Sequence, residues 1–278
     1  MHKIGFMEGR LSPLVDGRIQ SFPWLHWKQE FISAQKINIH IMEWTIDNER
    51  LYENPLLTKV GQKEIRVLCQ RHDIRIPSLT GDCFMQAPLW KSAGESRAAL
   101  ECDFYEIAKG CAAVGISMIV VPLVDNGRLE DLDQENILVQ FLEKQSEFLA
   151  SLNLQVIFES DFAPSQLARF ISRLDPVLFG INYDIGNSAA LGFNPAEEFA
   201  FYGHRILNVH IKDRVFGGTT VALGTGNANF EAVFKELNSI YYQGNFILQT
   251  ARAENDDHVT PLARNRDMVA GWIDQFGL

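Results

Sequence analysis

Eight short apolar runs alternate with eight longer amphipathic segments along this chain of 278 residues, and this alternation restricts its fold more than any other feature. The runs are mostly continuous, without the polar residues at every second position that mark a half-exposed strand. Such runs are typical of parallel strands covered on both faces. We predict strands at Lys3–Phe6, Ile39–Trp44, Ile76–Gly81, Met118–Pro122, Gln155–Glu159, Gly180–Asp184, Leu207–His210 and Phe246–Thr250.

The segments that separate these runs are predicted to be helices. Several begin with a residue that favours a helix start, such as Pro164 or the pair Asn194-Pro195. The predicted helices are Trp24–Lys36, Gly61–His72, Gly94–Val114, Gln134–Leu152, Pro164–Leu174, Pro195–Tyr202, Asn229–Tyr241 and Thr260–Phe276. Strict alternation of eight strands and eight helices predicts a single (β/α)₈ TIM barrel over residues 1–278. A doubly wound sheet is the alternative, but no G-x-G-x-x-G follows its first strand.

Charge and composition exclude several classes of function. The formal net charge is −10, whereas nonspecific binding to nucleic acid or to an anionic membrane needs a basic surface. No apolar run approaches the roughly 20 residues of a membrane span. The N-terminus has no pattern of a signal peptide, and the four cysteines show no C-x-x-C pair, so we expect free thiols and a cytoplasmic location.

Three predicted strands end on residues that can bind a metal or move a proton. Glu159 and Asp184 are 25 residues apart, and Asp184 and His210 are 26 apart. Each interval has room for one helix and one strand, so the three side chains could meet at the carboxyl ends of successive strands, where barrels place their chemistry. Acids at strand ends also stabilise the starts of helices. Three such residues on successive strands favour a site that suits Mn²⁺, Co²⁺, Fe²⁺, Zn²⁺ or Mg²⁺.

The motifs around these residues resemble the sugar-phosphate isomerase/epimerase superfamily, the xylose-isomerase-like barrels. They are Phe158-Glu159, Tyr183-Asp184-Ile-Gly-Asn187, His210-Ile-Lys-Asp213 and Leu223-Gly-Thr-Gly226. The superfamily includes ketose 3-epimerases, pentulose-5-phosphate 3-epimerases and inosose dehydratase. The resemblance covers essentially the whole chain. It implies a small carbohydrate substrate and a homodimer or homotetramer.

The resemblance also implies a divalent metal held by Glu159, Asp184, His210 and a fourth residue, which is Gln249 here instead of glutamate. In the family the two glutamates are thought to move protons on opposite faces of the substrate. Gln249 can offer an amide oxygen to a metal but has no titratable carboxylate. One base, Glu159, still suffices for isomerisation through an enediol or for an inosose-type dehydration. The alternative of another class is a noncatalytic barrel that binds a sugar.

Other polar residues near the predicted strand ends are candidates for substrate binding. Glu43 ends the second strand, Lys212 and Arg214 follow His210, and Arg252 and Arg10 could each contact a phosphate or carboxylate. Asn187 could orient Asp184 or cap a helix, and we prefer the cap. We predict Gly224-Thr-Gly226 as a flexible loop. A solvated charge run is the alternative at Asp213 and Arg214. Trp44, Phe84 and Trp90 could form apolar walls over a sugar ring, but core or interface packing is the preferred interpretation for each.

Overall fold

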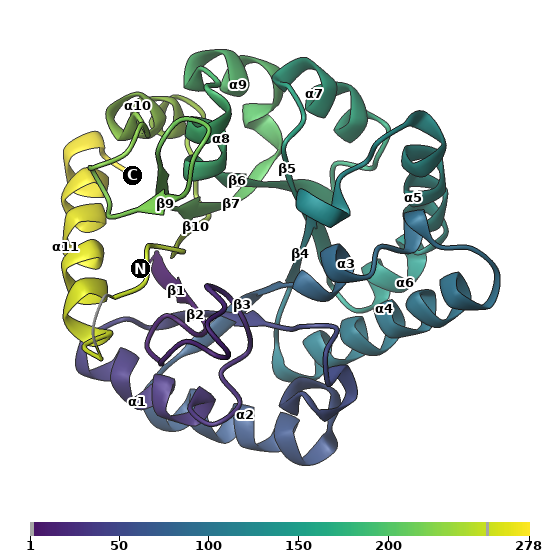
Figure 1. The fold of residues 1–278 in the computed structure, drawn as a ribbon, viewed down its shortest axis with the longest axis horizontal. Coiled ribbons are helices and arrows are strands. Elements are labelled where there is room, and N and C mark those ends of the chain that lie inside the picture. Colours follow the sequence, from purple (N-terminus) through teal and green to yellow (C-terminus); the bar gives the residue numbers. More distant parts are fainter. Residues whose placement is uncertain (1–2, 254–255) are drawn as a thin grey trace.

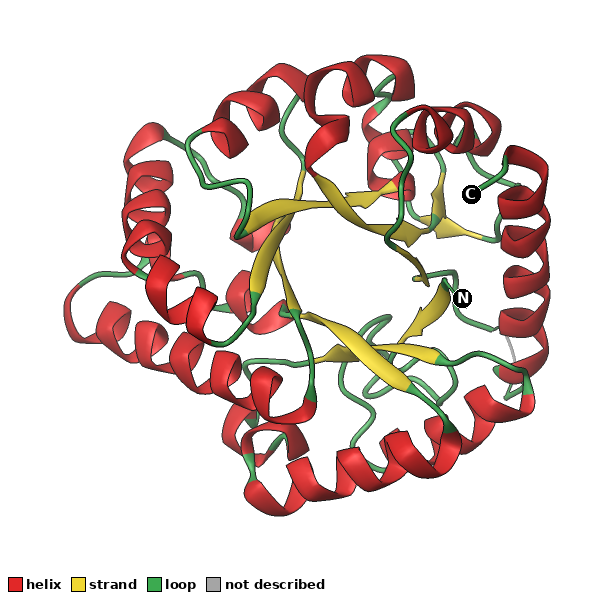
Figure 2. Ribbon diagram, turned by 180° about the vertical axis from the view of Figure 1, so that it is seen from behind, coloured by secondary structure: helices red, strands yellow, loops and turns green. Residues whose placement is uncertain are grey.

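Eight parallel strands close into a barrel in the structure, a computed structural model that describes residues 3–253 and 256–278 (Figures 1 and 2). Around the barrel the order is β1 (Ile4–Met7), β10 (Asn245–Leu248), β7 (Ile206–Ile211), β6 (Phe179–Asp184), β5 (Gln155–Ser160), β4 (Met118–Leu123), β3 (Arg75–Thr80) and β2 (Ile41–Thr45). Strand β2 pairs again with β1, so the sheet has no free edge. This closure confirms the predicted barrel and excludes the open, doubly wound sheet.

The helices surround the barrel, as Figure 2 shows. They are α1 (Trp27–Lys36), α2 (Lys59–His72), α4 (Gly94–Val114), α5 (Leu132–Lys144), α6 (Ser146–Ser151), α7 (Pro164–Ser172), α9 (Pro195–Tyr202), α10 (Phe230–Ser239) and α11 (Val259–Phe276). All eight predicted helices are confirmed, and each observed end lies within three residues of the predicted one. The helix expected at 134–152 is divided near Gln145 into α5 and α6. Pro164 and Pro195 occupy first helical positions, where the missing N–H costs nothing.

Several short elements were not predicted. Helices α3 (Asp82–Gln86) and α8 (Ile185–Leu191) directly follow strands, and β8 (Asp213–Arg214) pairs with β9 (Thr220–Val221) as an antiparallel hairpin. Single 3₁₀ turns lie at Leu51–Glu53, Pro55–Leu57, Leu89–Lys91, Asp125–Gly127 and Gly203–Arg205. These elements are too short for a hydrophobic period to reveal them.

The largest apolar core lies between the outside of the barrel and the helices. It includes Trp44, Phe84 and Trp90, which confirms the preferred core interpretation. Two small apolar clusters, Met7–Ile41–Ile247 and Met118–Val120–Ile157, are separate from this core. Several polar side chains on the strands are also almost fully buried: Glu43, Ser78, Thr80, Asn182, Asn208 and His210. Within the described residues, no helix is long and apolar enough to cross a membrane.

Candidate metal centre and its pocket

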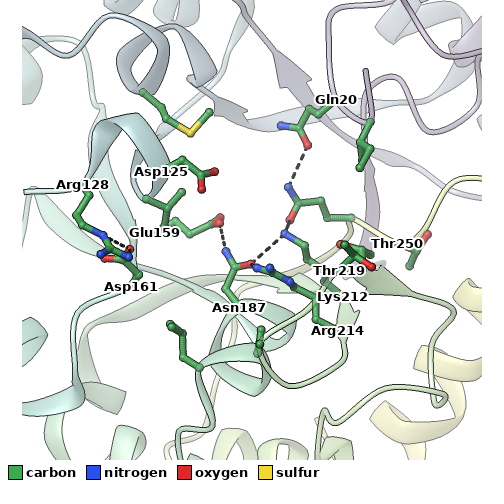
Figure 3. Close-up of a pocket in the computed structure, with 18 of the residues that line it drawn as sticks. Gln20, Asp125, Arg128, Glu159, Asp161, Asn187, Lys212, Arg214, Thr219 and Thr250 are labelled. Atoms are coloured by element: carbon green, nitrogen blue, oxygen red, sulfur yellow. Dashed lines mark hydrogen bonds and ion pairs between the residues drawn. The ribbon is translucent and has the colours of Figure 1, made fainter. Parts of the chain in front are cut away.

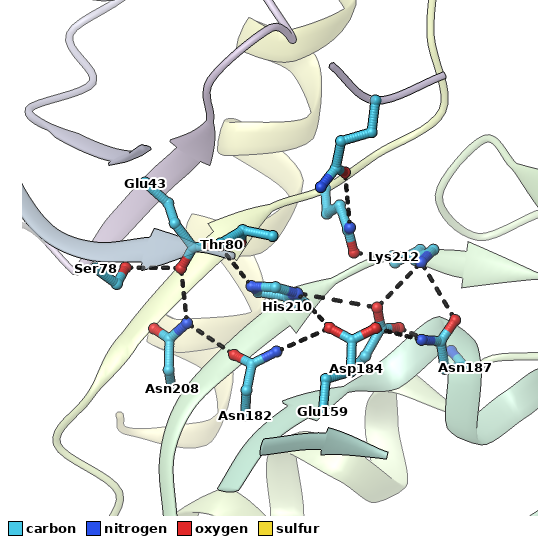
Figure 4. Close-up of polar contacts among 12 residues, drawn as sticks. Glu43, Ser78, Thr80, Glu159, Asn182, Asp184, Asn187, Asn208, His210 and Lys212 are labelled. Atoms are coloured by element: carbon cyan, nitrogen blue, oxygen red, sulfur yellow. Dashed lines mark hydrogen bonds and ion pairs between the residues drawn. The ribbon is translucent and has the colours of Figure 1, made fainter. Parts of the chain in front are cut away.

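The three predicted ligands meet at the carboxyl ends of adjacent strands. Asp184 ends β6 and pairs in register with His210 on β7, and Glu159 is the fifth residue of β5. One ligand atom from each residue lies within 4.8 Å of the other two. All three residues are buried, with exposed fractions of 6% for Glu159, 4% for Asp184 and 0% for His210. Figure 4 shows them converging.

Glu43 fixes the ring of His210. Oε1 of Glu43 lies 2.7 Å from Nε2 of His210, and the two Glu43 oxygens also accept hydrogen bonds from Ser78, Thr80 and Asn208. Because these neighbours all donate, Glu43 acts as an acceptor and Nε2 of His210 carries the proton. Such a partner sets the tautomer of a metal-binding histidine.

The other ring nitrogen of His210 faces the two carboxylates. Nδ1 lies 3.1 Å from Oε2 of Glu159 and 4.0 Å from Oδ2 of Asp184. This nitrogen is buried, and it has no hydrogen-bond partner with suitable geometry among the described residues. Two carboxylates and an imidazole nitrogen are a donor set that divalent transition metals accept. The residues present therefore fit a divalent cation.

The pKa values of these groups reflect burial and mutual charge. Burial lowers the pKa of His210, but Glu43 and Glu159 outweigh this effect and raise it to about 10. Burial acts to raise the pKa of Glu159, yet the close contact with His210 and its charge leave that pKa below its ordinary value. Burial keeps the pKa of Asp184 above its ordinary value, although the charge of Lys212 opposes this. The cluster thus holds negative charge that a cation would neutralise.

The preferred prediction for Asn187, a helix cap, is wrong. Asp184 is the cap of α8, because its Oδ1 accepts the backbone N–H of Asn187 at 2.7 Å. The Asn187 side chain instead donates to Oε1 of Glu159 at 2.5 Å, while Asn182 donates to Oε2 at 3.1 Å. These two amides fix the orientation of the Glu159 carboxylate.

Lys212 and Gln249 border the metal-binding group on one side. Nζ of Lys212 donates to Oδ2 of Asp184 at 3.1 Å and to Oε1 of Gln249 at 3.3 Å. It also donates to Oδ1 of Asn187 at 3.2 Å. The amide oxygen of Gln249 therefore faces an ammonium group, and a fixed positive charge lies beside one candidate ligand.

A cavity of about 520 Å³ borders this group at Glu159, whereas Asp184 and His210 are not among its lining residues. Figure 3 shows the lining. The predicted site residues that line it are Arg10, Glu159, Lys212, Arg214 and Gln249. The guanidinium of Arg214 donates to Asn187 and to the backbone oxygen of Gly218.

Two predicted substrate contacts do not line this cavity. Glu43 is fully buried against His210. Arg252 donates to the backbone oxygens of Gly9 and Ser12, so it supports the loop that carries Arg10.

The loop at Gly224-Thr-Gly226 is bonded in place, contrary to the predicted flexible loop. Asp213 is fully buried and accepts the backbone N–H groups of Gly224, Gly226 and Ala228 at 2.9–3.0 Å. The interpretation of Asp213 as a solvated charge is therefore wrong. A carboxylate that binds three N–H groups holds this loop beside the β8–β9 hairpin.

Some residues of the site were missed from the sequence. Asn182 and Asn208 lie two positions before Asp184 and His210, so the period of a strand puts each pair on the same face. That spacing is a signal that could have been used. Gln20 and Asp82 come from a loop and a short helix, and no sequence pattern relates them to Gln249.

Comparisons with known proteins agree with the barrel fold. A family model described as "Xylose isomerase-like TIM barrel" matches residues 31–272. An inosose dehydratase from Clostridium botulinum is 24% identical over 73% of this chain and 78% of its own length. A protein of Haemophilus influenzae provisionally named as an L-ribulose-5-phosphate 3-epimerase is 22% identical, covering 100% of this chain and 98% of its own.

A solved structure shows the same fold. The D-allulose 3-epimerase from Methylomonas sp., in complex with D-allulose, superposes with a TM-score of 0.76 at 14% identity, over 97% of this chain and 96% of that one. At such low identity the likeness establishes the fold alone. The match to the family model extends over most of the sequence. The chain belongs to the xylose isomerase-like TIM barrel family.

Proposed function

We propose that this protein is a divalent-metal-dependent isomerase or epimerase that acts on a sugar or sugar phosphate. The observation that carries the proposal is the orientation of His210. Its Nε2 is held by Glu43, and its Nδ1 faces Glu159 and Asp184 beneath a cavity large enough for a sugar. A barrel with a purely structural role has no need of this arrangement, which leaves the buried Nδ1 of His210 without a hydrogen-bond partner among the described residues.

The residues have distinct roles in this proposal. Glu159, Asp184 and His210 would hold the metal, which when bound would act as a Lewis acid on a carbonyl and a neighbouring hydroxyl. Glu159 lines the cavity and is held by Asn182 and Asn187, so it is the base that removes the proton next to the carbonyl. In an isomerisation the same carboxylate returns the proton to the neighbouring carbon of the enediol. An epimerisation would need a proton from the opposite face, which Gln249 cannot supply.

The cavity wall supplies donors for the oxygens of the substrate. Arg10, Lys212 and Arg214 line it together with the amide of Gln249. These groups can bind hydroxyl, carbonyl or phosphate oxygens and fix the sugar over Glu159. An inosose-type dehydratase would use the same base and metal, and only analysis of products separates the two reactions.

A noncatalytic sugar-binding barrel is the second candidate. Gln249 supports it, because a glutamine cannot serve as a second acid or base. Lys212 also supports it, since its positive charge beside Asp184 opposes the binding of a cation.

Hydrogen exchange tests the proposal directly. Metal-free protein would be loaded with Mn²⁺ and incubated in D₂O with ketoses, ketose phosphates and inososes. Proton NMR would then follow the hydrogen next to the carbonyl. We expect exchange with at least one of these compounds and a loss of about 10²-fold or more in Glu159→Gln. Glu197→Gln, an exposed change on α9, is the matched control.

The two candidates give different results in this experiment. If the metal-loaded protein binds a sugar but exchanges no hydrogen in any compound, the noncatalytic barrel is correct. Equal exchange in wild type and Glu159→Gln would remove Glu159 from the role of base.

A further inference from the structure

Two amides connect a carboxylate to an ammonium group at the cavity, an arrangement that we call the amide bridge. Nε2 of Gln20 donates to Oδ2 of Asp82 at 2.7 Å, and Nε2 of Gln249 donates to Oε1 of Gln20 at 3.0 Å. At the other end, Nζ of Lys212 donates to Oε1 of Gln249 at 3.3 Å. Figure 3 shows Gln20 and Lys212 on the same side of the cavity.

Every hydrogen bond in the amide bridge runs in the same direction. Lys212 has only donors and ionised Asp82 has only acceptors, so each residue between them must accept on one side and donate on the other. An amide does both, whereas a carboxylate only accepts. Arg10 strengthens the order, because its Nη2 also donates to Oε1 of Gln20, at 3.2 Å. The oxygen of Gln20 is thus fixed toward Gln249.

A glutamate at position 249 would break this order. Its carboxylate oxygen would face the amide oxygen of Gln20, and the nitrogen of Gln20 is already bound to Asp82. Gln249 is only 7% exposed and Gln20 is half-buried, so both oxygens are largely removed from water. Two such acceptors that face each other are costly because neither is then satisfied.

We propose that Asp82 and Gln20 are positioning residues that require an amide at position 249 and that, through it, close the loop of residues 9–23 over the cavity. Gln249 is then part of the wall that binds the substrate. Its amide is committed to Gln20 and Lys212, and the metal is left to three side chains. This last consequence rests on the proposed function, whereas the amide bridge itself does not.

A double-mutant cycle tests the requirement for an amide. Thermal unfolding would be measured with a chelator present, for wild type, Gln249→Glu, Asp82→Asn and the double variant. A pH of about 8.5 keeps Asp82 ionised, because its pKa is raised to about 7, chiefly by burial. No metal or substrate is present, so the result is independent of the proposed function.

We expect Gln249→Glu to lower the unfolding midpoint by on the order of 5 °C in the wild-type background. In the Asp82→Asn background the loss should be less than half as large. The asparagine side chain of that variant can donate to Gln20, whose amide can then reverse and donate to the new carboxylate, with the loss of its hydrogen bond from Arg10. Residue 82 is linked to residue 249 through Gln20. A general effect of packing at residue 249 would not be rescued by a change at residue 82. Gln70→Glu, on the exposed face of α2, is the control for added charge.

Limited digestion with trypsin tests the closure of the loop. Arg18 lies in the loop and its side chain is 45% exposed. Cleavage after Arg18 should be several-fold faster in Gln249→Glu than in wild type, and the double variant should recover most of the protection.

Two results would overturn the inference. One is an equal loss of midpoint in both backgrounds, and the other is a loss no larger than that of Gln70→Glu. If Gln249→Glu does not fold, Gln20→Glu places the carboxylate at the other amide position of the bridge. The same rescue by Asp82→Asn is then expected, and its absence would have the same meaning.

Discussion

Glu43 and His210 are joined by a 2.7 Å hydrogen bond between β2 and β7, two strands that are separated by β1 and β10 around the barrel. Both residues are fully buried. Burial acts to raise the pKa of Glu43, but the charge and hydrogen bond of His210 outweigh it and lower that pKa. This contact across the barrel decides which nitrogen of His210 faces the candidate metal centre.

Loss of Glu43 should weaken metal binding although Glu43 is not a ligand. In Glu43→Ala the ring of His210 loses the acceptor that fixes its tautomer, so we expect an affinity for Mn²⁺ or Zn²⁺ that is about 10- to 100-fold lower. Isothermal titration of chelator-treated protein measures this affinity. Glu231→Ala, on an exposed part of α10, is the control. An unchanged affinity in Glu43→Ala would show that His210 keeps its orientation unaided.

Loss of His210 should abolish metal retention. His210→Ala leaves two carboxylates and removes the only nitrogen donor of the group. Plasma mass spectrometry of the dialysed protein should find no bound metal, while the circular dichroism spectrum stays that of a folded barrel. His204→Ala, an exposed change, should retain the metal. If His210→Ala keeps as much metal as wild type, the site is elsewhere.

Removal of the positive charge at Lys212 should strengthen metal binding. Its Nζ is 3.1 Å from Oδ2 of Asp184, so a bound cation is repelled at short range. We expect about tenfold tighter binding of Mn²⁺ in Lys212→Met, well below the full Coulomb energy because side chains and water adjust. The same variant should bind a sugar less well, since Lys212 lines the cavity. Lys235→Met, whose ion pair with Glu231 lies on the surface, serves as the control. Weaker metal binding in Lys212→Met would contradict this account.

Glu30 should make the folded protein less stable as the pH rises. Burial raises its pKa to about 7, even though Gly9, Leu11 and Ser12 donate to it. The folded state therefore holds this proton more tightly than the unfolded chain does. Its contribution to stability is complete below about pH 4.5 and is lost as the pH rises through about 7.

Comparison with Glu30→Gln isolates this contribution. Denaturant unfolding would be measured at about pH 5 and about pH 7.5, with a chelator present. The free energy of unfolding should decline less with pH in the variant than in wild type. The difference can reach about 1.4 kcal/mol for each pH unit within that window. Glu8 and Arg252 interact with Glu30 and remain in both proteins. An equal decline in the free energy of unfolding of both proteins would indicate that Glu30 titrates as an exposed glutamate does.

The sequence by itself determined the barrel and the three residues at its centre. Uninterrupted apolar runs report strands that are buried on both faces, and the intervals between Glu159, Asp184 and His210 report one β/α unit each. Both signals are local or periodic patterns in the sequence, so they can be recognised without knowledge of tertiary contacts. Helix α8 was not predicted, because its seven residues complete scarcely two turns and so show no hydrophobic period.

Only the tertiary structure decided how the site is built around those three residues. Glu43 precedes His210 by 167 positions and Gln20 precedes Gln249 by 229, yet each pair shares a hydrogen bond. No period in the sequence encodes such a pairing, because barrel closure brings these strand ends and loops together. The direction of a hydrogen bond between two buried amides depends on which groups occupy the ends of the bridge. The role of Gln249 can therefore be assigned only from its contacts with Gln20 and Lys212 and from the bond between Gln20 and Asp82.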